Sequence, residues 1–220
     1  MEKNNGKIVA VVALVIAVVS LSVGFAAFSA TLTIESASAT AKQGTNTFAT
    51  DVKYTQGQTV TCYEGASGTT ALTAGSYNGG TAANQTWTGV SVPLTTDVRT
   101  VRCEAEITNA SAYVANLKQI SIADYLTCAS AGSGDAAATN VTDVCNTVTA
   151  TVTIDSDTTT FTSSGATSPN KNAFTGTAST IAADNGTKKV NLIIAYGSGV
   201  TPDGDITITI PTISLLYKTN

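Results

Sequence analysis

The sequence contains no histidine, so the side chain that most often serves as a general base or metal ligand is missing. A Ser-His-Asp triad, the zinc protease motif HExxH and mixed Cys/His zinc sites are thereby excluded. Charged residues make up only 12% of the chain, and the net charge is −4. The basic residues are scattered singly, whereas a nucleic-acid binder carries a basic patch or stripe. We therefore expect a protein that is not an enzyme, holds no metal or cofactor, and binds no nucleic acid.

Pairs of aspartates are the remaining candidates for a metal site. Asp155 with Asp157, and Asp203 with Asp205, could each contribute oxygen atoms to a Ca²⁺ ion, which prefers several oxygen ligands. Neither pair continues into a complete calcium-binding loop motif. Neither pair is marked out as the two carboxylates of a glycosidase. We interpret all four as turn and cap residues.

The N-terminus carries the features of an export signal. Lys3 and Lys7 precede an uncharged apolar stretch at residues 8–28. This stretch fits both the apolar region of a signal peptide and a membrane-spanning helix, which needs about 20 apolar residues. The positive-inside rule keeps the two lysines in the cytoplasm. We expect residues 1–28 to be a signal peptide or an N-terminal membrane anchor that contacts the membrane at least during export, and residues 29–220 to be an extracellular domain.

The end of the apolar stretch leaves these two alternatives open. Gly24 and Ala26 are the small residues that a signal peptidase site needs ahead of a cut before Ala27. A cut there would release a free N-terminal strand, because apolar and polar residues alternate from Ala30 to Ile34. Without the cut, the same strand stays close to the membrane. The residues of this cleavage and donor-strand junction are Gly24, Ala26, Ala27, Phe28, Ser29, Leu32 and Ile34.

The four cysteines indicate two disulfides, since an even number in an exported chain is typical of an oxidising compartment. Three pairings are possible, and we favour Cys62–Cys103 and Cys128–Cys145. Closing the small-residue loop between Cys128 and Cys145 would contribute roughly 3 kcal/mol. Alternation places Cys62 and Cys103 on the buried faces of two strands. We expect this pair to link strands across the core.

Composition and patterning predict an all-β fold. Threonine, which suits an exposed strand face, accounts for about 40 of the 220 residues. Short alternating runs are separated by turn signals at 77–80, 184–186 and 202–204, and residues 162–180 are predicted to form a surface loop. Many short strands without intervening helices favour a jelly-roll-like β-sandwich, here preceded by an N-terminal hydrophobic helix. The expected strands are 30–35, 48–54, 59–63, 86–92, 99–108, 113–122, 147–155, 188–196, 205–210 and 212–217.

Three segments resemble the TasA/camelysin family of exported bacterial surface proteins. They are "VGFAAFSATLTI", "VPLTTDVRTVRCEAEITNASAYVANLKQISI" and "GDITITIPTISLLY". The resemblance implies a jelly-roll domain and self-association into biofilm-matrix fibres, in which an N-terminal strand completes the sheet of the next subunit. The chain departs from the family where Ala30, rather than Asp, follows Ser29, and in its four cysteines. The metallopeptidase label of some relatives does not apply to a chain without histidine.

Two other functions remain as alternatives. A monomeric, membrane-anchored surface domain could bind a glycan or a protein, with Trp87, Tyr77 and Tyr63 near glycine-rich turns as candidate contacts. The competing interpretation of these aromatic residues is core packing. A pilin-like subunit ranks lower, because the apolar stretch lacks the glutamate that type IV pilins use in assembly.

Overall fold

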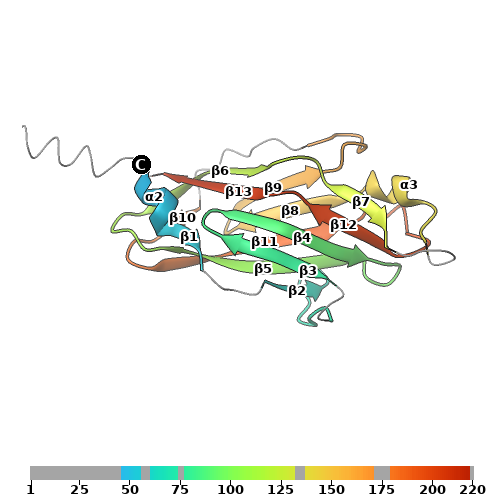
Figure 1. The fold of residues 1–220 in the computed structure, drawn as a ribbon, viewed down its shortest axis with the longest axis horizontal. Helices are drawn as coiled ribbons and strands as arrows, with labels where there is room; N and C mark the ends of the chain where they lie inside the picture. Colours follow the sequence, from blue (N-terminus) through green and yellow to red (C-terminus); the bar gives the residue numbers. More distant parts are fainter. Residues whose placement is uncertain (1–45, 56–59, 74–76, 132–136, 171–178, 219–220) are drawn as a thin grey trace, which may run out of the picture. The chain divides into compact units, whose positions relative to one another are not determined.

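The computed structural model describes residues 46–55, 60–73, 77–131, 137–170 and 179–218. These residues form two antiparallel β-sheets with one shared core, so the expected all-β sandwich is confirmed (Figure 1). The predicted N-terminal helix, the junction residues and the expected strand at 30–35 lie outside the described residues. Among the residues that are described, no helix has the length and apolar character needed to cross a bilayer.

The first sheet, here called sheet A, has the order β1-β5-β11-β8-β9, and β2 also pairs with β5. Along β5 and β11 the buried and less buried residues alternate, because successive side chains of a strand point to opposite faces. The inward face carries mainly apolar residues, and the outward face carries mainly polar ones. The strands are β1 (Val52–Tyr54), β2 (Thr61–Glu64), β5 (Thr100–Asn109), β8 (Thr149–Ile154), β9 (Asp157–Thr162) and β11 (Gly186–Ala195).

The second sheet, sheet B, has the order β10-β6-β13-β4-β12-β7, and β3 also pairs with β4. Pro211 separates β12 from β13, and both strands pair with β4, as expected for a kink between two short strands. Figure 1 shows α2 (Asn46–Asp51) beside β1 and α3 (Val141–Cys145) beside β7. The strands of sheet B are β3 (Asn78–Ala83), β4 (Thr86–Leu94), β6 (Ala115–Ile122), β7 (Thr127–Ser130), β10 (Thr180–Ile181), β12 (Ile206–Ile210) and β13 (Ile213–Lys218).

The expected strand at 48–54 is wrong over its first half. Residues Asn46–Asp51 form the helix α2, and only Val52–Tyr54 is a strand. Phe48 and Val52 are both buried and lie four residues apart, a spacing that fits one helical turn as well as a strand. The side-chain amide of Gln85 donates to the backbone oxygens of Phe48 and Val52, which fixes the end of this helix.

The expected turn at 77–80 is also wrong, because Asn78–Ala83 is the edge strand β3. Gly79 lies so close to the backbone oxygen of Val60 that a Cβ atom would collide with it, and Gly80 has a φ of +79°. These glycines therefore serve close packing at an edge. The turn itself falls at Asn84, whose φ is +52°, and the turn predicted at 184–186 is present with positive φ at Asp184 and Asn185.

Besides α2 and β3, four short elements were not predicted. They lie in segments rich in small polar residues, where periodicity is weak. The strand β9 forms a two-residue hairpin with β8, and β7 is held by its pairing with β12 rather than by an apolar pattern of its own. The unpredicted elements are β7, β9, β10 and α3.

Candidate functional site

The outward face of sheet A carries the clearest polar cluster. Glu104 on β5, Asn191 on β11 and Thr153 on β8 stand opposite one another in the strand register, so they form one row across three strands. Arg102 and Ile193 form the neighbouring row. All five side chains point away from the core, because residues two apart on a strand share a face. The alternation that places Cys103 on the buried face of its strand places its neighbours Arg102 and Glu104 on the outward face.

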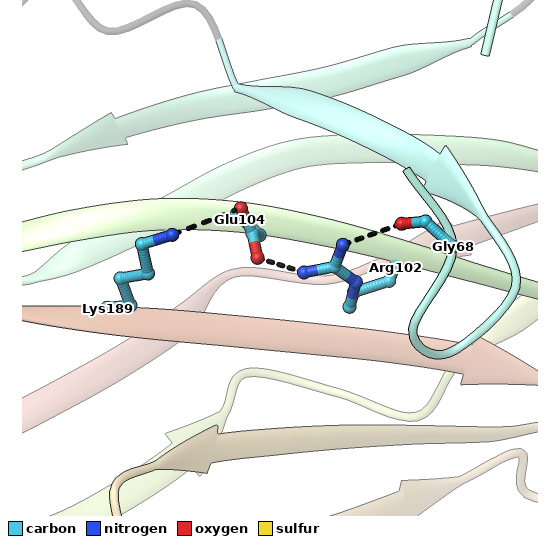
Figure 2. A network of polar contacts seen from close by, with 4 residues as sticks. All are labelled: Gly68, Arg102, Glu104 and Lys189. Carbon is cyan, nitrogen blue, oxygen red and sulfur yellow. Dashed lines mark hydrogen bonds and ion pairs between the residues drawn. The ribbon is translucent and has the colours of Figure 1, made fainter. Parts of the chain in front are cut away.

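Arg102 is the centre of the cluster (Figure 2). Its Nη1 donates to Oε1 of Glu104, and its Nη2 donates to the backbone oxygen of Gly68 at 2.8 Å. The guanidinium also lies 4.9 Å from the ring centre of Tyr63, which is a cation–π distance. Arg102 therefore connects the sheet to the loop that follows β2.

The charge of Glu104 is balanced on both sides. Arg102 pairs with Oε1, and Nζ of Lys189 lies 3.7 Å from Oε2. The Lys189 side chain is 69% exposed, whereas that of Glu104 is only 23% exposed. An exposed pair of this kind contributes little to stability. The effect of the two pairs is to balance the negative charge of Glu104, since each carboxylate oxygen has a cationic neighbour.

The loop after β2 rises beside this cluster and has a tight conformation. Gly65 has a φ of +79°, and a Cβ atom on Gly68 would lie 1.9 Å from the backbone oxygen of Glu64. Backbone hydrogen bonds from Glu64 to Thr70 and from Gly65 to Thr100 hold its two ends. Glycine at both positions is therefore required for the loop to fold back against β5.

A hollow of about 360 Å³ lies between this loop and the sheet. Two of its lining residues carry a buried polar atom without a hydrogen-bond partner among the described residues, namely Nε of Arg102 and Oδ1 of Asn191. The sequence did not single out Asn191, although the alternation along β11 would have placed it on the same face as Lys189. The hollow is lined by Ala66, Ser67, Arg102, Glu104, Thr153, Asn191 and Ile193.

The structure places the four cysteines in the two favoured pairs, Cys62–Cys103 and Cys128–Cys145. The expectation that the first pair links strands across the core is wrong. Cys62 and Cys103 are direct neighbours in the register of β2 and β5, so the pair joins adjacent strands of sheet A. Both side chains still face the core, as the alternation predicted, and neither is exposed. The Cys128–Cys145 pair joins β7 to α3.

The three aromatic candidates for ligand contact do not come together. Trp87 is fully buried, and its indole Nε1 donates to the backbone oxygen of Gly79 at 2.8 Å, so it is a core residue. Tyr77 packs against the core, and its hydroxyl accepts a hydrogen bond from the backbone N–H of Cys62. Only Tyr63 lies on the outward face, where it packs against Arg102. The sequence pattern could not separate these roles, because all three lie near glycine-rich segments.

Three of the four aspartates of the acidic pairs have structural partners. The carboxylate of Asp203 accepts hydrogen bonds from the Thr139 side chain and from the backbone N–H groups of Thr139 and Asn140, and these bonds lower its pKa. Asp157 is buried and accepts from the backbone of Ser179, and Asp155 pairs with Lys188. Within the described part of the chain, no group of three or more acidic, cysteine or histidine side chains could hold a metal ion.

A second hollow, of about 380 Å³, lies beside the Cys128–Cys145 pair. Its lining includes Val141, Thr142 and Ser163, and the Ser163 hydroxyl donates to the backbone oxygen of Cys145. No unpartnered buried polar side-chain atom of the described residues belongs to this lining. The hollow on sheet A is therefore the stronger candidate for a binding site.

Two tyrosine hydroxyls are buried without a partner in the described part of the fold. They belong to Tyr54 on β1 and Tyr217 on β13. Burial raises the pKa of both phenols, and the carboxylates of Asp155 and Asp157 raise that of Tyr217 further. The ordinary pKa of a tyrosine phenol is 10.0. Above that pH the phenols ionise in the unfolded chain but stay protonated in the folded protein, so the free energy of unfolding falls as the pH rises.

We expect the double substitution Tyr54→Phe, Tyr217→Phe to flatten this alkaline loss of stability. Each buried phenol should cost about 1.4 kcal/mol per pH unit above its unfolded pKa. At neutral pH the variant should be no less stable than the wild type, because the hydroxyls make no hydrogen bond to lose. Urea unfolding at neutral and alkaline pH measures both effects. The control is Tyr113→Phe, whose side chain is 46% exposed; an equal flattening there would contradict the assignment.

Comparison with protein-family models and with curated proteins finds no match for this chain. The resemblance to TasA and camelysin therefore rests on the three sequence segments. Two of them fall mainly on β5, β6, β12 and β13, and the first lies outside the described residues.

Proposed function

We propose that this chain is a non-enzymatic structural protein of the cell surface, a TasA-like subunit of a fibre or biofilm matrix. The observation that supports it best is the order along the chain, in which an apolar stretch at residues 8–28 is followed by an alternating pattern at residues 30–34 and then by a β-sandwich. The two cysteine pairs at disulfide distance favour an oxidising, extracellular environment. The proposal includes a jelly-roll class for the sandwich and an N-terminal hydrophobic helix that contacts the membrane during export.

Assembly would use the junction that begins at Ala27. A free strand at residues 27–34 can add to an exposed sheet edge of a neighbouring subunit, where backbone hydrogen bonds provide affinity and alternate side chains fill pockets. Strands with a single neighbour offer such edges. In the described part of the fold, the strand order of sheet A ends at β1 and β9, and that of sheet B ends at β10 and β7.

We expect Leu32→Asp, Ile34→Asp to abolish filaments in protein recovered from the cell surface. These two apolar residues share the face that a donated strand would bury, and burying two unpaired carboxylates is costly. The matched control is Thr31→Ser, Thr33→Ser, which alters the opposite face and should leave assembly unchanged. Electron microscopy measures filament formation, and N-terminal sequencing of the same material shows whether the chain begins at Ala27.

Two outcomes would contradict the fibre proposal. One is a wild-type protein that stays monomeric under all conditions tested, and the other is unchanged filaments in the aspartate variant. A monomer with a retained N-terminus would instead favour the second candidate, a membrane-anchored surface domain that binds a glycan or protein. The hollow on sheet A is the observation that favours this second candidate. A pilin-like subunit remains the lower alternative.

A further inference from the structure

We propose that the hollow on the outward face of sheet A binds a neutral polyhydroxyl ligand, that is, a saccharide. Its volume of about 360 Å³ lies at the lower end of the range for small-molecule pockets, about 300–1,000 Å³. Fibre formation is not needed for this proposal, because every lining residue belongs to a single sandwich.

The two unpartnered atoms define the chemistry of the ligand. Nε of Arg102 can only donate a hydrogen bond, and Oδ1 of Asn191 can only accept one. A buried polar atom without a partner costs about 1–3 kcal/mol, so a ligand that satisfies both atoms recovers that cost. A hydroxyl group both donates and accepts. Neighbouring hydroxyls on a sugar ring can therefore serve both atoms.

The remaining lining suits a sugar ring as well. Ser67 and Thr153 add hydroxyl groups that can donate or accept, and Ala66 and Ile193 add apolar surface for the C–H groups of a ring. Such a mixture of apolar surface and a few convergent polar groups is typical of small-molecule sites. Arg102 is fixed by its bonds to Glu104 and Gly68, so its Nε is already oriented (Figure 2).

The charges around the hollow favour a neutral ligand. Glu104 has a cationic neighbour at each carboxylate oxygen, and two of the three guanidinium nitrogens of Arg102 are already engaged. A carboxylate or phosphate ligand would therefore meet an arginine whose charge is already paired, and it would lie beside the charge of Glu104.

The position of the hollow disfavours an extended peptide. Its floor is formed by β5, β11 and β8, and β11 pairs with both of the others at these residues. The backbone N–H and C=O groups of β11 are thus already hydrogen-bonded to the two neighbouring strands. A peptide that adds to a sheet needs an unpaired edge, whereas here only side chains point outward.

The test is ligand-observed saturation-transfer NMR with the full chain in a detergent that has no sugar headgroup. The probes are glucose, galactose and N-acetylglucosamine at millimolar concentration, with glucuronate as the anionic counterpart of glucose. We expect transfer to at least one neutral sugar and none to glucuronate. Asn191→Leu should weaken that binding roughly tenfold, because it removes the acceptor and leaves the bound hydroxyl unpaired.

Two further variants separate binding from folding. Ser67→Trp fills the hollow from an exposed loop position and should also abolish transfer without changing the unfolding midpoint. Thr187→Val lies on the same face of β11 but outside the hollow, and it should bind like the wild type. Transfer to no sugar would overturn the proposal and assign the two atoms to ordered water. Binding by glucuronate alone, or full binding by Asn191→Leu, would overturn it as well.

Discussion

Trp87→Ala is expected to lower the free energy of unfolding by about 3–5 kcal/mol, the usual cost of removing a large buried aromatic side chain. Trp87 is fully buried on β4, and its ring meets that of Tyr54 edge-on with centroids 6.2 Å apart. The substitution removes this contact between the two sheets and also leaves the backbone oxygen of Gly79 without its indole donor. Urea or thermal unfolding measures the change.

Trp87→Phe separates the two contributions to this loss. Phenylalanine keeps an aromatic ring but cannot donate to Gly79, so we expect a smaller loss that includes about 1–3 kcal/mol for the unpaired oxygen. Tyr113→Ala, at an exposed position, serves as the control and should change stability by less than about 0.5 kcal/mol. A Trp87→Ala variant as stable as this control would show that the residue is not a core anchor.

Removal of the Cys62–Cys103 pair by Cys62→Ala, Cys103→Ala is expected to cost about 4 kcal/mol. The two residues are separated by 41 positions, and cross-linking them lowers the conformational entropy of the unfolded chain. The matched variant Cys128→Ala, Cys145→Ala should cost less, about 3 kcal/mol, because its separation is 17. Unfolding of both variants beside the wild type gives the comparison.

Burial provides a second readout on the same cysteines. Cys62 and Cys103 are fully buried, whereas Cys128 and Cys145 are partly exposed, so a mild reductant should open the Cys128–Cys145 pair first. Mass analysis after alkylation identifies the released thiols. Reduction of Cys62–Cys103 first, or four free thiols in protein recovered from the cell surface, would contradict the structure.

The alternation of apolar and polar residues predicts the strands correctly wherever a strand has one buried face. It predicted the inward side of β5, and it placed strands at most of β4, β6, β8, β11, β12 and β13. It failed at α2, where a four-residue apolar spacing fits a helix equally well, and at β3, where glycine serves close packing. Strands such as β7 and β9 carry little pattern of their own, because their neighbours hold them in the sheet.

The candidate site could be predicted only in part, because it depends on which strands pair. The outward position of Arg102 and Glu104 follows from the sequence around them. The neighbours that complete the hollow, Asn191 and Thr153, come from distant strands, and which strands pair is a property of the whole fold. Alternation favours the pairing of Cys62 with Cys103, but their place within one sheet also depends on this long-range order.

The position of Cys62 beside Cys103 has a mechanical consequence. A pull on the chain from its N-terminal side would reach α2 and then β1, and the three residue pairs of β1 with β5 would open one after another. The covalent link at the second residue of β2 would stop this peeling, because Cys62 is bonded to its neighbour on β5. Of the described residues, those ahead of Cys62 could be extended, and the rest of the sandwich would bear the load as a single body.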